Sequence, residues 1–331
     1  MHTKQMTDDE IEVYLDKART LSGFFREIGP KYDEENTFAY PSIQAYKDSG
    51  LGALPVPKEF GGPGGDILTA SKVIRILSQG DSAITLAYNM HYIMVGIMMG
   101  LMSETQSKYW LGRVADGDIM FGPFSEMRAG FSGLADMKAV PQPDGGWKLY
   151  GKKTWGTLCE AADIITTNAT ITDAEGNLPE DFEGRVNAES LFVQDFIVDA
   201  DGKGDGIWIE KTWNAMGMHA TGTQVIHFDG FYVPEDGFVC EWRAGAFGVL
   251  EWASLMFASI YCGMQERILE ESRAVLSKKA LSLVGGSSFR HGTIFERLYR
   301  DSAASLFQPL NADQTNTYIG EYLLQPEELN D

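Results

Sequence analysis

The spacing of apolar residues changes twice along the chain, and this change limits the possible folds more than any other feature. Up to Ala115 apolar residues recur at helical spacing, as Ile11 and Leu15 do. From Asp118 the period is two, which is typical of strands, and helical spacing returns after Gly245. This order predicts an α+β protein with three domains. Their expected ranges are an all-α domain at 1–117, a β-domain at 118–236 and a second helical domain at 237–331.

Capping residues, prolines and glycines divide the first domain into helices. Thr7 precedes Asp8-Asp9-Glu10 in the pattern of a capping box, and Pro41 opens a short helix that closes at Gly50. Further helices are predicted at 66–78, 81–100 and 103–115. Residues 83–102 carry no formal charge, but Asn89 and His91 would be costly in lipid. We therefore expect a buried bundle helix there and no membrane span.

The middle of the chain reads as a series of strands. Asp144-Gly145-Gly146 is a hairpin-like turn between two short alternating segments. Strands are predicted at 163–171, 190–198, 206–213 and 224–233. After Gly245 a helix is expected to run to about Lys279.

Charge and cysteine usage exclude several classes of partner. The formal net charge of -20 repels nucleic acid and anionic membrane, so neither is expected to bind. Cys159, Cys240 and Cys262 are odd in number and lack metal-ligand spacing, which favours a reducing compartment and no metal site. The polar, acidic first residues do not read as a signal peptide, so a cytoplasmic protein is predicted.

Three short segments carry a resemblance to a known family. They are Ser125-Glu126 beside a Gly-containing turn, Lys153-Thr154-Trp155-Gly156-Thr157, and Gly217-Met218-His219-Ala220-Thr221-Gly222-Thr223. In order and spacing they resemble the middle domain of the acyl-CoA dehydrogenase family, flavoproteins that hold FAD and a thioester against a small β-barrel. The resemblance implies an N-terminal α-helical domain, a middle β-barrel domain and a C-terminal α-helical domain. The last is shortened, because Lys279 runs directly into Ala280 where the family has a further loop and helix.

The resemblance implies a set of flavin-binding residues. Trp155 and Thr157 match the positions where the family lays an indole along the isoalloxazine and a hydroxyl beside N5. Phe124 and Ser125 match the loop that meets the pyrimidine edge of the flavin. The pair Gly285-Gly286 matches a segment that contacts the FAD pyrophosphate of a neighbouring subunit, which implies a homodimer or homotetramer. An ordinary helix C-cap would also explain paired glycines.

The substrate contacts and the base are less well matched. Ser132 is a candidate substrate contact, although it lies one residue further along than in the family. His219 replaces a common arginine and could bind substrate or flavin, or fill a turn. The usual loop glutamate position falls on Gln308-Pro309-Leu310, which has no ionisable group. Glu251, near the register of a second family solution, is the candidate catalytic base, or else an ordinary solvent-facing residue of a first helical turn.

Three functional hypotheses follow. The first is an FAD-dependent acyl-CoA dehydrogenase of fatty acid metabolism, in which Glu251 takes the α-proton and flavin N5 takes the β-hydride. Its partners would be an acyl-CoA or another small molecule and an electron acceptor flavoprotein. The second is a flavin-dependent monooxygenase or oxidase on the same fold, which needs no glutamate because a partner reductase supplies reduced flavin. The third is a degenerate, non-catalytic family member, suggested by the shortened last domain.

Overall fold

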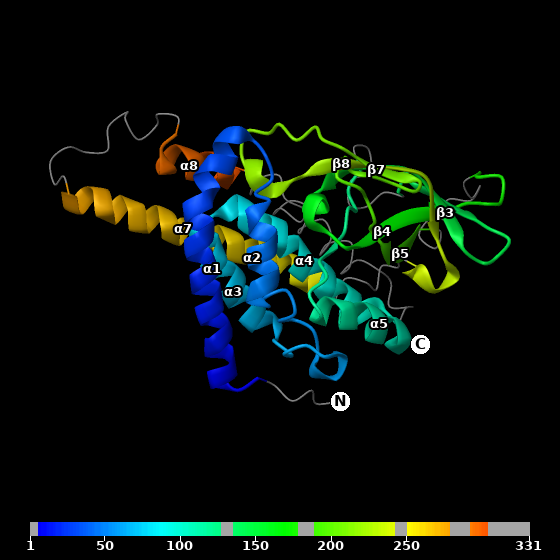
Figure 1. Ribbon diagram of the computed structural model, residues 1–331, viewed down its shortest axis with the longest axis horizontal. Coiled ribbons are helices and arrows are strands. Elements are labelled where there is room, and N and C mark those ends of the chain that lie inside the picture. Colours follow the sequence, from blue (N-terminus) through cyan, green and yellow to red (C-terminus); the bar gives the residue numbers. More distant parts are fainter. Residues whose placement is uncertain (1–5, 127–134, 178–188, 242–249, 279–291, 304–331) are drawn as a thin grey trace, which may run out of the picture.

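The molecule has a helical half and a sheet half, which lie side by side in Figure 1. The structure is a computed structural model that describes residues 6–126, 135–177, 189–241, 250–278 and 292–303. The helices come from both ends of this sequence, and the strands come from its middle. Their bounds are α1 (Asp8–Glu35), α2 (Pro41–Ser49), α3 (Ile67–Gly80), α4 (Ser82–Leu101), α5 (Glu104–Ala115), α7 (Leu250–Lys278) and α8 (Ile294–Ala303).

Side-chain caps define where the helices of the first half begin. The Thr7 hydroxyl accepts from the backbone N–H of Glu10, and the Glu10 side chain accepts from the Thr7 N–H, which completes a capping box. Asp66 caps α3 and Asp81 caps α4 through their carboxylates, and Ser103 opens α5 with a second capping box. Each cap satisfies N–H groups that a helix start leaves unpaired, so the sequence sets these boundaries locally.

Helix α4 is the buried centre of the bundle. It is long and apolar enough to cross a membrane by length and composition, but 78% of its most apolar window is buried inside the protein. Helices α3 and α7 pack together and both contact α4. The absence of a side chain at Gly96 lets α7 approach, since a Cβ there would lie 2.2 Å from the Trp252 ring. The expected buried bundle helix is therefore confirmed.

The strands form one mixed sheet with two ends. Among the described residues it contains nine strands in the order β6-β7-β8-β3-β2-β4-β5-β9, with β1 pairing β4. The middle domain that we expected as a barrel is thus seen as a single sheet whose ladder ends at β6 and β9. The strand bounds are β1 (Met120–Phe121), β2 (Lys138–Pro141), β3 (Trp147–Gly156), β4 (Ile164–Ile171), β5 (Glu189–Asp195), β6 (Lys203–Gly204), β7 (Ile207–Glu210), β8 (Gln224–Val233) and β9 (Phe238–Glu241).

The α+β fold class is confirmed, and two strands end earlier than expected. The strand predicted at 190–198 spans Glu189–Asp195. The strand predicted at 206–213 ends at Glu210. The reason lies in the next strand: the Gln224 side-chain oxygen accepts from the backbone N–H groups of Thr212 at 2.9 Å and Trp213 at 3.0 Å. These two N–H groups are satisfied by a side chain instead of a ladder, so the chain leaves the sheet there.

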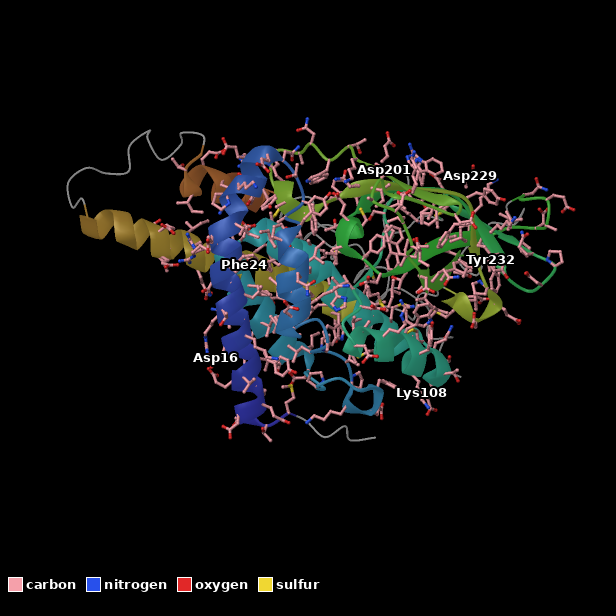
Figure 2. All side chains as sticks on the ribbon, viewed as in Figure 1. Asp16, Phe24, Lys108, Asp201, Asp229 and Tyr232 are labelled. Carbon is pink, nitrogen blue, oxygen red and sulfur yellow. The ribbon has the colours of Figure 1, made fainter. Side chains whose placement is uncertain are left out.

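Acidic side chains cover much of the outside. Figure 2 shows Asp16 projecting from α1, and Asp201 and Asp229 lying on the sheet half. All three are exposed. Their exposure fits the formal net charge of -20. Charged side chains are seldom fully buried in proteins, so the buried charges described below require a structural reason.

Candidate functional site

The end of β3 presents an aromatic ring and a hydroxyl. The β3–β8 register is irregular between Lys153 and Gly156, and this bulge re-aims the residues that follow. Trp155 is 51% exposed, and its indole meets the Trp213 ring edge-on with centroids 5.7 Å apart. Thr157 is half-buried just beyond the strand end. We call the surface formed by Trp155, Thr157 and Ser125 the β3 face.

The segment 123–126 lies along β3 and is held there by backbone atoms. The Ser125 carbonyl accepts from the backbone N–H of Thr154 at 3.1 Å. The Pro123 carbonyl accepts from the Thr167 hydroxyl at 2.9 Å, and Phe124 is half-buried against the core. The structure therefore brings Phe124 and Ser125 next to the strand that carries Trp155.

A buried ion pair fixes this arrangement from inside the sheet. Lys153 Nζ donates to Glu126 Oε1 at 2.5 Å and to Asn168 Oδ1 at 2.9 Å, and both charged side chains are buried. Burial lowers the pKa of Lys153, while the Glu126 carboxylate acts in the opposite direction. Nearby, burial raises the pKa of Glu189, which accepts from the Asn168 amide. The Lys153–Glu126 pair thus locks the segment next to Ser125 onto β3.

Three threonine hydroxyls form a continuous chain behind the β3 face. Thr157 Oγ1 lies 2.8 Å from Thr223 Oγ1, which lies 2.7 Å from Thr221 Oγ1. The Thr221 hydroxyl donates to the Met218 carbonyl at 2.9 Å. Thr221 and Thr223 are buried, so these contacts are shielded from water. We call this series, with the Met218 carbonyl at its end, the threonine chain.

The turn that carries this chain is held in an uncommon conformation. Met218 has a φ of +58°, a left-handed value that non-glycine residues seldom adopt. The Trp213 indole N–H donates to the Met218 carbonyl at 2.9 Å, and the Met218 N–H donates to Asp301 Oδ1 at 3.0 Å. Both polar groups of this peptide position are therefore fixed by side chains from other parts of the protein.

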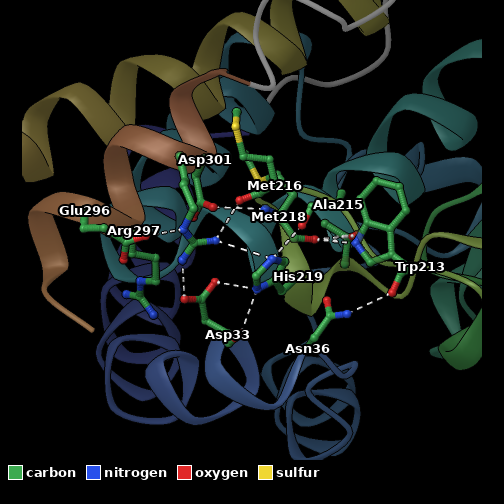
Figure 3. Close-up of polar contacts among 12 residues, drawn as sticks. Asp33, Asn36, Trp213, Ala215, Met216, Met218, His219, Glu296, Arg297 and Asp301 are labelled. Carbon is green, nitrogen blue, oxygen red and sulfur yellow. Dashed lines mark hydrogen bonds and ion pairs between the residues drawn. The ribbon is translucent and has the colours of Figure 1, made fainter. Parts of the chain in front are cut away.

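A second set of buried charges joins the helices to the same turn, as Figure 3 shows. Arg300 of α8 donates to Asp33 Oδ2 of α1 at 2.7 Å, to Glu296 Oε1 at 2.6 Å and to the Met216 carbonyl at 3.0 Å. His219 contacts the Asp33 carbonyl through Nδ1 at 2.7 Å and the Ala215 carbonyl through Nε2 at 2.9 Å. The interdomain cluster, as we call it, comprises Asp33, Asp81, His219, Glu296, Arg297, Arg300 and Asp301.

Two carboxylates of this cluster have a raised pKa. Burial raises the pKa of Asp301 to about 7, with the nearby Asp81 and Asp33 acting in the same direction and its bond from the Met218 N–H opposing. Burial also raises the pKa of Asp81, which faces Arg297 at 3.1 Å. The cluster therefore holds more carboxylates than its arginines neutralise easily.

The predicted site residues separate into three groups. Phe124 and Ser125 lie beside the strand that carries Trp155, and Thr157 follows the end of that strand. His219 lies in the interdomain cluster, with both ring nitrogens on backbone carbonyls. Glu251 is exposed on the first turn of α7, next to the Trp252 that packs on α4. The remaining candidates lie outside the described residues; they are Ser132, Gly285, Gly286 and the segment Gln308-Pro309-Leu310.

Sequence reasoning missed the residues that support this face. Lys153, Glu126 and Thr223 occur inside the motif segments, but no supporting role was assigned to them. A signal existed for Lys153, because a lysine buried within a strand must have a partner. For Thr223 the only signal was its place in a Gly-flanked turn. In the part of the chain that the structure describes, no group of three or more His, Cys, Asp or Glu could hold a metal ion.

Comparison with known proteins identifies relatives of this chain. Residues 14–118 match the N-terminal domain of acyl-CoA dehydrogenases. The putative acyl-CoA dehydrogenase YdbM of Bacillus subtilis is 24% identical over 221 residues, covering 65% of this chain and 53% of YdbM. A dibenzothiophene monooxygenase of Rhodococcus erythropolis is 23% identical over 267 residues, covering 77% of this chain and 60% of the relative. The probable FMNH2-dependent monooxygenase SfnC of Pseudomonas putida is 22% identical, covering 80% and 62%.

Solved structures show the same fold. FMN-bound TdsC from Paenibacillus sp. A11-2 matches with a TM-score of 0.68 and 21% identity over 79% of this chain and 64% of TdsC. Butyryl-CoA dehydrogenase from Megasphaera elsdenii matches with a TM-score of 0.68 and 19% identity over 96% of this chain and 78% of that enzyme. The chain spans between 53% and 62% of the length of the three curated relatives named above. Residues 14–118 therefore resemble the N-terminal domain of acyl-CoA dehydrogenases, and the chain has a fold similar to that of TdsC and butyryl-CoA dehydrogenase.

Proposed function

We propose that this protein is a flavin-dependent monooxygenase that receives its flavin in the reduced state. The observation that carries the proposal is the make-up of the β3 face. Among the described residues, this face carries an indole and hydroxyl groups. The candidate base, Glu251, is exposed to solvent. Dehydrogenation of a thioester requires a carboxylate held near the substrate and away from water, so that its pKa approaches neutrality. Oxygen chemistry on a reduced flavin has no such requirement.

The residues of the β3 face fit a flavin ring. A half-exposed indole with Trp213 at its edge offers a flat apolar surface, and the half-buried Thr157 hydroxyl lies two residues away along the chain. The flavin would supply the electron pair that reduces molecular oxygen, with one oxygen atom going to the substrate and the other to water. Trp155 would cover the ring, Thr157 would hydrogen-bond its N5 edge, and Ser125 would bind the pyrimidine edge.

The rest of the site keeps these groups in place. The Lys153–Glu126 pair holds the segment with Ser125 against β3. The threonine chain holds the Thr157 hydroxyl against the turn after β7. Preorganised groups of this kind lower the cost of binding and orienting a planar cofactor. FMN is the proposed cofactor in place of the FAD expected from sequence, because FMN is bound in the TdsC structure and FMNH2 is named for SfnC.

An acyl-CoA dehydrogenase remains the second candidate. It is favoured by the match of residues 14–118, by the similarity to YdbM and by the position of Glu251 at the start of α7. In that case Glu251 would take the α-proton of an acyl-CoA and the flavin would take the β-hydride. An acyl-CoA would then be the substrate and an electron acceptor flavoprotein the partner.

Two measurements on the purified protein separate these candidates. The first is the visible spectrum during titration with FMN and with FAD, followed by anaerobic addition of acyl-CoA thioesters. The second is oxygen uptake with FMN that is kept reduced by an added flavin reductase and NADH. A monooxygenase is expected to raise coupled oxygen uptake in the presence of an aromatic sulfur or nitrogen heterocycle and to show no bleaching by thioesters. Bleaching by a thioester would overturn the monooxygenase proposal.

The variant Glu251→Gln sharpens this result. It is expected to leave oxygen uptake unchanged if the protein is a monooxygenase, and to abolish bleaching if it is a dehydrogenase. Glu104→Gln is the matched control, because Glu104 is also an exposed glutamate in a first helical turn. A protein that binds neither flavin would contradict both candidates.

A further inference from the structure

The direction of every hydrogen bond in the threonine chain is fixed by its end. The Met218 carbonyl can only accept, so the Thr221 hydroxyl must donate to it. A hydroxyl has one hydrogen, so Thr221 can then only accept from Thr223. By the same count Thr223 can only accept from Thr157. The hydrogen atoms therefore run in one direction, from Thr157 through Thr223 and Thr221 to Met218.

Neighbouring contacts keep the chain from reversing. The Met218 carbonyl also accepts from the Trp213 indole N–H at 2.9 Å and from the Thr221 backbone N–H at 3.3 Å, and Asp301 holds the Met218 N–H. Reversal would leave the Thr221 oxygen facing the Met218 oxygen at 2.9 Å with no hydrogen between them. Thr221 and Thr223 are buried, so water does not offer an alternative partner easily.

This polarity decides what Thr157 offers on the β3 face. Its single hydroxyl hydrogen points inward to Thr223, and its remaining lone pairs are left for the partly exposed side next to Trp155. The hydroxyl therefore accepts hydrogen bonds from a ligand on this face and does not donate to it.

We propose that Thr157 is an obligatory hydrogen-bond acceptor for the bound flavin, so that the site prefers the reduced flavin, whose N5 carries a hydrogen, over the oxidised form. This inference rests on the proposed function, because it takes the flavin N5 edge to lie at Thr157. Oxidised N5 has a lone pair and no hydrogen, so it would face another acceptor. That unfavourable pairing is absent when N5 is protonated.

The preference would suit an exchange of flavin with a reductase. Reduced flavin made elsewhere would bind tightly, and the oxidised flavin left after turnover would dissociate more easily. Thr223 and Thr221 act here as positioning residues, since they touch neither flavin nor substrate and act only through the orientation of Thr157.

The test is the ratio of the dissociation constants for oxidised and reduced FMN, measured as the shift of the FMN midpoint potential on binding. One neutral hydrogen bond changes this ratio by about fivefold, which is about 20 mV for a two-electron couple. The wild-type protein is expected to shift the potential to more positive values. Thr157→Val removes the acceptor and is expected to lose about fivefold of the preference.

The decisive variant is Thr223→Val. It leaves the Thr157 hydrogen without a partner inside the protein, so Thr157 can donate to oxidised N5. Oxidised FMN is then expected to bind about fivefold more tightly than to the wild type, whereas damage to the fold would weaken binding of both forms. Thr223→Ser keeps the chain and is expected to behave as the wild type.

A matched control removes a buried hydroxyl elsewhere in the sheet. Thr170 is buried and its hydroxyl donates to the Ala135 carbonyl at 2.7 Å, outside the threonine chain. Thr170→Val is expected to reduce stability without moving the potential. A second readout is the 15N chemical shift of N5 in labelled reduced FMN, which is expected to show the N5–H hydrogen bond in the wild type and its loss in Thr157→Val.

The possible failures are distinguishable. A wild-type protein that binds no flavin overturns the proposed function and this inference together. A wild-type protein that binds flavin while Thr223→Val has the same potential and the same affinity for oxidised FMN leaves the proposed function standing and overturns the inference alone.

Discussion

Two regions of this protein bury charged side chains, and they do so in different ways. The Lys153–Glu126 pair joins residues 27 positions apart within the sheet half, and its two charges are sealed from water. The interdomain cluster joins Asp33 and Arg300, 267 positions apart, and includes two carboxylates whose pKa is raised. The first region is local, and its one lysine faces Glu126 with Glu189 nearby. The second is assembled from distant elements and carries unbalanced acid.

Buried charge therefore serves two structural purposes in this protein. The local pair positions the segment around Ser125, so its loss should reach the proposed flavin face directly. The distant cluster holds α1, α8 and the turn at Met218 together, so its loss should reach that face only through the turn. Removing one partner of a buried ion pair lowers the free energy of unfolding strongly, because the other charge stays buried. The stability of an acid-rich cluster is expected to depend on pH.

The largest expected effect comes from Lys153→Met. It leaves the Glu126 carboxylate buried without its cation, and such losses cost about 3–5 kcal/mol in the free energy of unfolding. Denaturant unfolding measures this, and flavin titration should show weaker binding. Adding Glu126→Gln to Lys153→Met is expected to restore part of the stability, because the uncompensated charge is then gone.

Lys152→Met is the control for this prediction, since Lys152 is exposed on the same strand. It is expected to change stability little. If Lys152→Met and Lys153→Met destabilise the protein equally, the local pair has no special role and the contrast between the two regions disappears.

A change of pH is expected to have an intermediate effect on the free energy of unfolding, through the interdomain cluster. The pKa of Asp301 is about 7 in the folded protein and 3.8 ordinarily, so the folded state binds the extra proton between these values. The stability contributed by this proton is complete below about pH 3.8 and is lost as pH rises through about 7. Asp81, Asp33 and Arg297 face this group from α4, α1 and α8, and the Met218 N–H faces it from the turn.

Asp301→Asn tests this pH dependence. The variant keeps an acceptor for the Met218 N–H and removes the titrating proton, so it should flatten the fall in unfolding free energy between pH 5 and pH 7. The difference from the wild type over that range is expected to be on the order of 1–2 kcal/mol. Chemical denaturation at several pH values measures it. Parallel pH curves for the two proteins would show that Asp301 is not the group responsible.

The smallest effect is expected from an ion pair outside both regions. Arg26 of α1 donates to Glu270 of α7 at 2.7 Å, and the two side chains are 39% and 56% exposed. Arg26→Gln is expected to cost about 0.5 kcal/mol and to matter less at high salt, because water screens exposed pairs. Thermal unfolding at low and high salt measures it. A loss as large as that of Lys153→Met would mean that burial is not what distinguishes the two regions.

The helices and most strands could be predicted because local signals determine them. The Thr7 capping box and the apolar run of α4 are visible in the sequence and appear in the structure. The shortened β7 could not be predicted, because a side chain from β8 satisfies the N–H groups after it. A contact of this kind depends on the pairing of strands and not on their own residues.

The candidate site divides in the same way. Trp155, Thr157 and Ser125 are named by the motif segments, and the structure places Ser125 beside the strand that carries Trp155; their role toward a flavin stays a prediction. The supporting groups could not, because Thr223 and Asp301 act through contacts formed only on folding. His219 is expected to bind substrate or flavin, or to fill a turn. Its ring contacts Asp33, Ala215 and Arg300, and a role toward a substrate stays a prediction.

The contact between Asp33 and Arg300 also constrains how the chain reaches its native state. During synthesis α1 is made before α8, and the arginine partner of Asp33 follows it by 267 positions. The ion pair between Asp33 and Arg300 therefore cannot form until the residues up to Arg300 have been synthesised. Contacts of such long range are closed late and slowly. We expect the contact between α1 and α8 to form late in folding, after α8 has been made.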